Sequence, residues 1–551
     1  MSRRDRTHLL LTSLVIIIAG LLVYAELFDA RRQFTAYDDN AYVTSQPLVE
    51  GFRVGMIPKI FDPSTTVASN YHPLTVLSLG IDHALFGPSA RAMGLVNLTL
   101  HILTSLMVLL LLRRLLQERP WLPEIGALWF AIHPLHVESV AWVSGRKDVL
   151  YGLWFVTSLL CYIRHIDQSR RVMLLAAFGA FVLSCLSKPS AVVLPLVLVL
   201  VDIVRGRGIT LKTMAEKAPF LVVSLLIGII TVRAQTAAGA VADAETFSML
   251  ERIVIAGYGF VMYWVHMIWP VALNAFYPYP SVNNVFTLPW YAYVMPLLAA
   301  SMVTLPWLMR RRSITADAAT TGSTWSMLAL GSGWFAVTIM LVLQLVSVGM
   351  VIMADRYTYI PMIGMLCVIL IGLDLLLQRQ RIVGWMIVIA FTVLQGVQTY
   401  QQAGMWRNTE TIWTSILERT GNTGTADEVV RANLSDGYVM IYVLRGIHYF
   451  EANKPEQSYA DLRHIMNAES PRTDAYERLG LLAGMMGKID ESIAAYTVAI
   501  SRPDASADAY LNRGIGYLRT GRPDDARRDF EMGLTKNPLP EIRARLEGFL
   551  R

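Results

Sequence analysis

Charged residues are scarce in this sequence. Asp, Glu, Lys and Arg make up 16% of the 551 residues, whereas 54% are hydrophobic, and soluble domains carry about 25% charged residues. A single soluble globule and a disordered chain are therefore excluded. Cysteine is also rare: Cys161, Cys185 and Cys367 all lie inside apolar runs, so the sequence offers no disulfide framework and no cysteine metal site.

The long apolar runs predict a polytopic membrane protein. Runs that can cross a bilayer, or nearly so, occur at 9–27, 92–112, 123–142, 149–164, 171–187, 190–204, 217–233, 290–309, 325–347, 359–377 and 382–402. Basic clusters such as Arg113–Arg114 and Arg310–Arg312 alternate with these runs as expected for a cytoplasmic N-terminus. The net charge of +6 is therefore attributed to membrane anchoring, and no nucleic-acid partner is predicted.

Two apolar segments need separate interpretations. The run at 9–27 follows three arginines and lacks a small-residue cleavage site, so it predicts a retained signal-anchor helix. The segment 253–270 is rich in Tyr and Trp and would break the alternation if it spanned, so we expect an interfacial or re-entrant helix. This topology places 28–91, 143–148, 234–289, 348–358 and the chain after about 403 on the non-cytoplasmic side.

The last third of the sequence repeats with a period of 34 residues. The period is marked by three aromatic positions and three glycines, namely Tyr442, Tyr476, Tyr510, Gly446, Gly480 and Gly514. The pattern resembles the tetratricopeptide repeat (TPR), an α-solenoid of helix pairs. Arg445 and Ser458 depart from it in the first unit, a partial unit is expected at 408–437, and 540–551 is expected to be a cap helix. The repeats either only stabilise the membrane part or, as we favour, bind a partner.

Two adjacent carboxylates, Asp38 and Asp39, follow the first apolar run on the predicted outer side. Neighbouring side chains point in different directions, so one can act as a base while the other is positioned or binds a cation. The alternative is a solvated turn in which an Asp caps a helix.

A second polar group falls at the end of the run 123–142. A continuous helix would place His133 and His136 on one face, with Glu138 about one turn beyond His133. Ionisable groups at membrane depth usually line a polar cavity, and the spacing matches no zinc motif. In the short loop that follows, Arg146, Lys147 and Asp148 carry charge at the height of lipid headgroups; interfacial anchoring would also explain Arg146 and Lys147.

Further candidates lie at other predicted outer turns. His72 precedes Pro73, and Lys188 stands at a turn between two runs. Arg356, next to Tyr357, could hold a phosphate bidentately or pair locally with Asp355. The aromatic segment 277–280 is either a lid or part of an interfacial belt.

Together these pieces resemble the TMTC-type proteins of the protein O-mannosyltransferase superfamily, which are GT-C membrane glycosyltransferases followed by TPRs. The resemblance is carried by Asp38-Asp39, the stretch from His133 to Asp148, Ser187-Lys188, Asp355-Arg356-Tyr357 with Pro361, and the TPR tail. Two positions depart from the family pattern. His72 stands where the family commonly has an Arg before Pro-Leu, and Lys147 stands where a small residue is usual.

The resemblance implies an all-α protein with a GT-C transmembrane domain of about eleven helices at 1–405 and a non-cytoplasmic TPR domain at 406–551. It implies inverting transfer of a sugar from a polyprenyl-phosphate carrier to a Ser or Thr hydroxyl of a protein, which the TPR domain would bind. Asp38 is the favoured base and Asp39 the second choice. The substrate-binding residues would be His72, His133, His136, Glu138, Arg146, Lys147, Asp148, Lys188, Arg356 and Tyr357.

No cofactor or metal is implied, although the adjacent acids leave a divalent cation open. The short loops favour a bacterial inner membrane, with the TPR domain in the periplasm. Two alternatives remain at this point. One is transfer of a whole oligosaccharide, for which the first loop is short, and the other is a non-enzymatic transporter or TPR scaffold.

Overall fold

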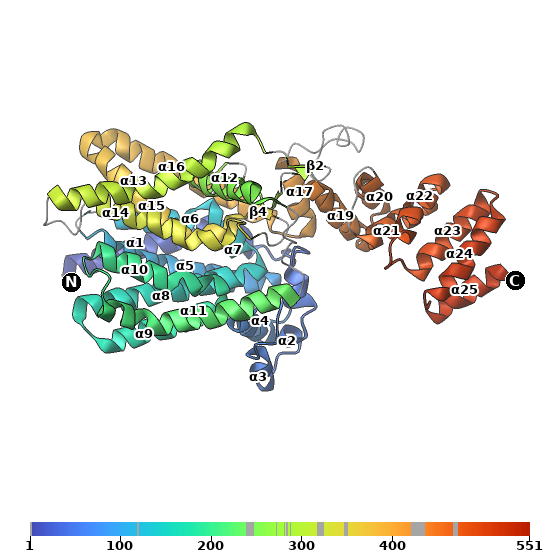
Figure 1. Ribbon diagram of the computed structural model, residues 1–551, viewed down its shortest axis with the longest axis horizontal. Coiled ribbons are helices and arrows are strands. Elements are labelled where there is room, and N and C mark those ends of the chain that lie inside the picture. The colour runs from blue at the N-terminus through green and yellow to red at the C-terminus, as the bar shows by residue number, and fades with distance from the viewer. Residues whose placement is uncertain are drawn as a thin grey trace. The chain divides into compact units, whose positions relative to one another are not determined.

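The computed structural model describes residues 3–117, 119, 121–237, 247–271, 273–279, 281–282, 285–286, 288–316, 324–346, 351–419, 436–466 and 472–551. The chain divides into two compact units: Met1–Tyr277 with Pro289–Ile412, and Pro278–Leu288 with Trp413–Arg551. Both consist almost entirely of helices (Figure 1), which confirms the predicted all-α class. The strands in the described residues are short: β1 (Tyr277–Pro278), β2 (Ser281–Val282), β3 (Val285–Phe286) and β4 (Val351–Met353).

All eleven apolar runs contain helices of the first unit. In the described residues, eight helices are long and apolar enough to cross a bilayer: α1 (Arg3–Val23), α5 (Ala90–Leu115), α8 (Arg146–Gln168), α11 (Leu211–Ala237), α13 (Met295–Ala316), α14 (Thr324–Ile339) with η8 (Met340–Val342), α15 (Pro361–Arg379) and α16 (Arg381–Met405). The other three are shorter: α6 (Leu122–Ile132), α9 (Arg171–Ser187) and α10 (Leu194–Val204). The segment 253–270 forms α12 (Met249–Ile268), which is not among the eight.

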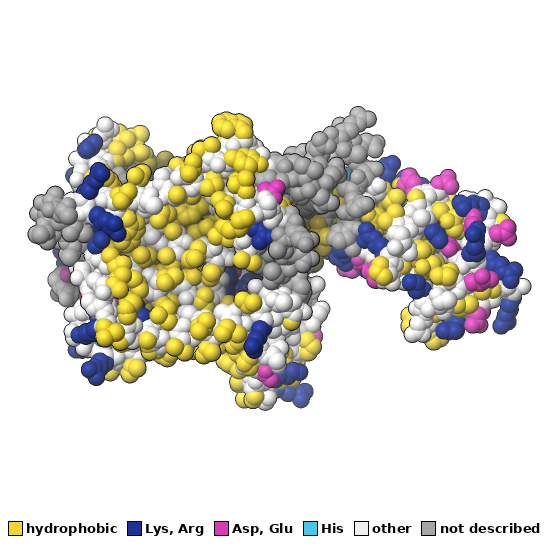
Figure 2. All heavy atoms as spheres, viewed as in Figure 1, with side chains coloured by type: hydrophobic (Ala, Val, Ile, Leu, Met, Phe, Trp, Pro, Cys, Tyr) yellow, Lys and Arg dark blue, Asp and Glu magenta, His cyan; other side chains and the backbone are white. Residues whose placement is uncertain are grey.

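The surface of these helices is apolar. Figure 2 shows hydrophobic side chains covering most of the visible face of the helical bundle, with Lys and Arg side chains gathered along one edge. Leu225 on α11 and Leu297 on α13 are 66% and 73% exposed, which is typical of side chains that face lipid. The chain is thus an integral membrane protein, as its composition predicts.

Arginines join the helix ends at one end of the bundle. Arg114 and Arg205 both pair with Asp167, near the end of α8, and Arg310 donates to the carbonyl of Ile203 at the end of α10. Asp148 lies nineteen residues before Asp167 in the same helix, and a helix rises about 1.5 Å per residue. Asp148 therefore marks the opposite end of the bundle, where the candidate site lies.

The predicted third span is not one continuous helix. α6 ends at Ile132, and η4 (Pro134–His136), α7 (Val137–Ala141) and η5 (Val143–Gly145) follow. Pro134 has no N–H, and the residue before a proline favours an extended backbone; His133 accordingly has φ −75° and ψ 132°. The expectation that His133 and His136 share a helix face is therefore wrong.

The predicted first outer loop contains several short helices. They are η1 (Ala25–Phe28), η2 (Asn40–Thr44), α2 (Pro47–Glu50), η3 (Val54–Met56), α3 (Ile57–Ile60) and α4 (Pro73–Phe86). Pro73 takes the first helical position of α4, where its missing N–H costs nothing. Three further 3₁₀ helices, η6 (Pro189–Val193), η7 (Trp290–Val294) and η9 (Asp355–Thr358), adjoin spanning helices. His72 directly precedes α4, and Lys188 directly precedes η6.

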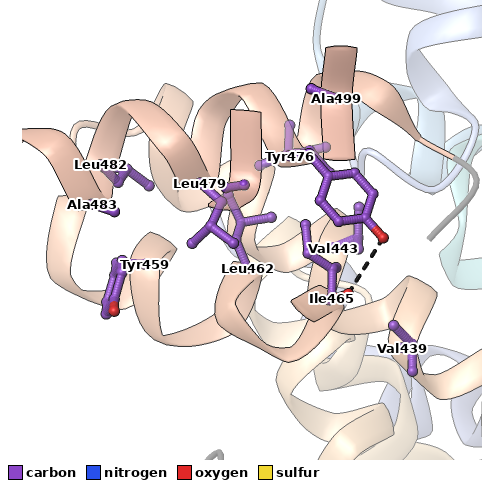
Figure 3. Packing of buried hydrophobic residues seen from close by; sticks show 13 residues of the cluster. Val439, Val443, Tyr459, Leu462, Ile465, Tyr476, Leu479, Leu482, Ala483 and Ala499 are labelled. Atoms are coloured by element: carbon purple, nitrogen blue, oxygen red, sulfur yellow. Dashed lines mark hydrogen bonds between the residues drawn. The ribbon is translucent and has the colours of Figure 1, made fainter. Parts of the chain in front are cut away.

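The second unit contains the predicted TPR solenoid. Its helices are α17 (Thr409–Arg419), which begins in the first unit, α19 (Asp436–Glu451), α20 (Pro455–Leu462) with η10 (Arg463–Met466), α21 (Thr473–Met485), α22 (Ile489–Ile500), α23 (Ala507–Arg519), α24 (Pro523–Thr535) and α25 (Pro540–Leu550). α21 packs on α22, and α23 on α24. Figure 3 shows the core of the first two pairs, where Tyr476 donates to the carbonyl of Ile465. The predicted partial unit at 408–437 extends outside the described residues.

The 34-residue period reflects close packing inside each helix pair. A Cβ on Gly480 would lie 2.8 Å from the Tyr496 ring, and one on Gly514 would lie 2.4 Å from the Phe530 ring. The first helix of a pair therefore needs glycine where an aromatic side chain of the second helix crosses it. The first unit's unusual Arg445 also has a structural role, because it forms two hydrogen bonds with Asp461.

Candidate functional site

Asp39 holds the first outer segment in place. One carboxylate oxygen accepts hydrogen bonds from the backbone N–H and the hydroxyl of Thr35, at 2.8 and 2.9 Å. The other accepts from the N–H and hydroxyl of Ser144, at 3.0 and 2.6 Å. Burial raises the pKa of Asp39, and these hydrogen bonds oppose that shift. With 1% of its surface exposed and all its bonds directed at the protein, Asp39 joins the first loop to η5.

Asp38 has a different environment. It lies in the turn before η2, is half-buried, and lines a cavity of about 430 Å³. Among the described residues its carboxylate makes no side-chain hydrogen bond or ion pair. A carboxylate that faces a cavity without a partner can accept a proton from a ligand there.

Three cations line the same cavity, and each is fixed differently. The Lys147 ammonium lies 4.5 Å from the centre of the Tyr42 ring and 4.3 Å from that of Trp142, and it has no carboxylate within 4 Å among the described residues. Such cation–π contacts hold an ammonium without neutralising it.

Lys188 and Arg356 are each paired with a carboxylate outside the cavity lining. Lys188 forms an ion pair with Asp148, and Arg356 forms one with Glu138, which also accepts the Arg356 backbone N–H at 2.9 Å. Among the described ion pairs, the carboxylate that pairs with Arg356 is that of Glu138, which lies 218 positions earlier in the chain. Asp148 and Glu138 thus hold two of the cations that line the cavity.

Aromatic and neutral polar groups line the cavity beside these cations. The His72 ring stacks on Tyr42 with 5.2 Å between the ring centres and 21° between the planes. Burial, with smaller contributions from Lys147 and Lys188, lowers the pKa of His72 to about 3. The imidazole is therefore neutral. Tyr357 also lines the cavity and lies beside both Lys188 and Arg356.

The remaining wall of the cavity is mostly apolar and belongs to lipid-facing elements. Four α11 residues at the helical spacing i, i+3, i+4, i+7 line it, namely Gly228, Thr231, Val232 and Gln235. The segment after α14 adds Leu341, Val342, Gln344 and Val346. Val232 and Val346 are 62% and 64% exposed, so the cavity has an apolar side continuous with the lipid-facing surface.

Three predicted site residues lie away from the cavity. His133 and His136 are fully buried: His133 contacts the Met267 carbonyl at 3.1 Å and accepts from the Leu135 N–H, and His136 contacts the Phe130 carbonyl. These contacts replace helix hydrogen bonds lost around Pro134.

Arg146 is also fully buried. Its guanidinium pairs with Asp82 and donates to Ser78, Asn97 and the Met93 carbonyl. The expectation that Arg146 lies in a loop at headgroup height is wrong, because α8 starts at this residue and its side chain points into the bundle.

Several lining residues were not predicted from the sequence. The rings of Tyr42 and Trp142 contact the Lys147 ammonium, and Asn70 also lines the cavity. Thr231 and Gln235, one turn apart in α11, are two further polar lining residues. Among the described residues no group of three or more His, Cys, Asp or Glu side chains could hold a metal ion.

The fold and cavity define a class: integral membrane proteins in which a helical bundle bears a charged cavity with an apolar side and is followed by TPRs. No family model matches the sequence. The chain is 41% identical over 96 residues to protein O-mannosyl-transferase TMTC2 of Mus musculus, a match that covers 17% of this chain and 11% of that protein. It is 36% identical over 103 residues to TMTC1 of Homo sapiens, covering 19% and 12%.

A longer match is to Tmtc1 of Drosophila melanogaster, 30% identical over 178 residues, covering 31% of this chain and 21% of that protein. The chain thus spans between about a tenth and a fifth of the curated relatives. The predicted resemblance to TMTC-type proteins is confirmed by these matches. Among solved structures, ArnT from Cupriavidus metallidurans bound to undecaprenyl phosphate aligns with a TM-score of 0.33 and 14% identity, over 94% of this chain and 79% of that chain.

Proposed function

We propose that the protein transfers a single sugar from a polyprenyl-phosphate carrier to a hydroxyl group of a protein. One observation carries the proposal: a single cavity combines a carboxylate that has no ion pair among the described residues, three cations, and an apolar side continuous with the lipid-facing surface. The similar proteins are named protein O-mannosyl-transferases. A polyprenyl-phosphate sugar is amphipathic, with a charged phosphate that suits the cations and an apolar chain that suits the apolar side of the cavity.

The proposed roles follow from the placement of the charges. Asp38 accepts the proton of the acceptor hydroxyl while its oxygen attacks the anomeric carbon. The bond between that carbon and the phosphate oxygen breaks, and the polyprenyl phosphate leaves with the electron pair. Lys147, Lys188 and Arg356 stabilise the charge on the leaving phosphate. No general acid is required, in contrast to a glycosidase, because a phosphate is a good leaving group.

The size and position of the cavity support two finer points. A volume of about 430 Å³ is typical of small-molecule pockets, which favours one sugar over a branched glycan. The cavity lies at the end of the bundle opposite to the arginine-joined helix ends, so the positive-inside rule supports a reaction on the non-cytoplasmic face.

Replacing Asp38 tests the base. D38N keeps the size of the side chain but cannot accept the proton, so we expect the rate of sugar transfer to fall by about 10²–10⁴-fold. Purified protein would be assayed with a polyprenyl-phosphate hexose and a hydroxyl-bearing peptide, and the product measured by mass spectrometry.

D62N is the matched control, because the Asp62 side chain belongs to the same segment, accepts hydrogen bonds only from Ser64 among the described residues and does not line the cavity. Full activity in D38N would exclude Asp38 as the base. A product carrying more than one hexose per event would instead indicate transfer of a whole glycan.

A further inference from the structure

A strained turn forms one edge of the cavity. Val67 and Asn70 exchange backbone hydrogen bonds of 2.9 and 3.0 Å, and the two residues between them, Ala68 and Ser69, have φ values of +47° and +63°. This is a type I′ turn, in which Asn and Gly are preferred. A residue with a Cβ rarely adopts the left-handed conformation, so the backbone is strained at Ala68 and Ser69.

The turn presents neutral groups to the cavity. Ala68, Asn70 and His72 all line it. The Asn70 amide donates to the Ala68 carbonyl at 2.6 Å, which fixes its orientation. The His72 residue is only 2% exposed. Its Nε2 atom is buried and has no hydrogen-bond partner among the described residues.

An unpartnered buried nitrogen is costly unless a ligand completes it. The neutral imidazole stacks on Tyr42 and can form a hydrogen bond with a ligand without contributing a net charge. Lys147, Lys188 and Arg356 line the same cavity and carry the positive charge suited to phosphate. A neutral hydrogen-bonding group on an aromatic surface suits the hydroxyl groups of a sugar.

We propose that the face formed by Ala68, Asn70 and His72 binds the hydroxyl groups of the donor sugar, with the His72 Nε2 atom as a specificity-determining hydrogen-bonding group. The inference rests on the proposed function and extends it, because it separates the sugar contacts from the phosphate contacts. It predicts that His72 distinguishes a sugar-bearing carrier from the bare carrier phosphate.

Two variants of similar length test this separation. H72M removes the hydrogen bond, whereas H72Q keeps an amide that can replace it. We expect H72M to weaken binding of polyprenyl-phosphate hexose by about five- to tenfold and to leave binding of polyprenyl phosphate unchanged, while H72Q stays close to the wild type. K188Q, which removes a cavity cation, should weaken both ligands. Native mass spectrometry of the full-length protein, titrated with each lipid, measures both affinities.

The outcomes separate the two proposals. If the wild type transfers hexose but H72M weakens both lipids equally, or neither, the inference about His72 is wrong and the proposed function stands. If the wild type binds both lipids but transfers no hexose, the proposed function is wrong. Should H72M fail to fold, N70A on the same face must show the same selective loss, and an unchanged N70A would then overturn the inference.

Discussion

Asp38 and Asp39 are neighbours whose side chains have different surroundings, and this difference can be measured. Asp39 accepts four hydrogen bonds from Thr35 and Ser144. In D39N the amide NH₂ must replace one carboxylate oxygen and would face a backbone N–H that can only donate. We expect D39N to be less stable by about 1–3 kcal/mol, seen as a lower melting temperature in detergent.

D38N is the matched comparison, since the Asp38 carboxylate makes no side-chain hydrogen bond in the described residues. Its melting temperature should equal that of the wild type. Equal melting temperatures for D39N and the wild type would show that Asp39 does not hold the loop.

The sequence identified the charged residues that line the cavity better than it identified the residues that hold them in place. Lys188 and Arg356 stand at turns between apolar runs, where a charge is conspicuous. Arg146 is just as conspicuous, yet it pairs with Asp82 inside the bundle. Whether a charge near a helix start faces a cavity or a buried partner depends on a residue 64 positions away, which spacing along the chain cannot show.

At the scale of elements, apolar run length predicted where the helices lie but not where one breaks. The run 123–142 has the composition of one span, and Pro134 alone interrupts it. Beyond the break, His133 and His136 contact the backbone carbonyls of Met267 and Phe130. The segment that follows carries Glu138, which pairs with Arg356. Irregular backbone of this kind is tolerated at membrane depth only where it is buried in protein, which agrees with the full burial of both histidines.

The helix pairs of the TPR tail allow a prediction from two glycines. A Cβ on Gly514 would lie 2.4 Å from the Phe530 ring, whereas one on Gly548 in α25 meets nothing within 4 Å. G514A should therefore destabilise the α23–α24 pair by about 1–3 kcal/mol, and G548A should stabilise α25 by about 0.5–1 kcal/mol.

Hydrogen exchange of peptides from α23, α24 and α25 in the full-length protein measures both changes locally. Faster exchange in α23 and α24 is expected only for G514A. Equal exchange in the two variants would mean that the glycine is not required for the packing of the pair.

On the scale of the whole molecule, the two units divide the proposed reaction. The described residues that line the cavity lie between Asp38 and Tyr357, within the first unit, so none of them belongs to the TPR helices. The 34-residue period was readable because each unit repeats the same packing. The repeated residues are those that pack within the helix pairs. They therefore carry no information about the ligand of the solenoid.

Ending the chain after Arg419 tests this division of labour. The shortened protein should bind polyprenyl phosphate within about twofold of the full chain, because no lining residue is removed. Transfer of sugar to a protein acceptor should fall by about tenfold or more if the repeats hold the acceptor near the cavity, whereas transfer to a short hydroxyl-bearing peptide should change little. Native mass spectrometry gives the lipid occupancy and glycopeptide analysis gives the transfer.

Equal transfer to the protein acceptor by both forms would show that the repeats do not present the acceptor. Loss of lipid binding from a folded shortened protein would show that the repeats complete the donor site.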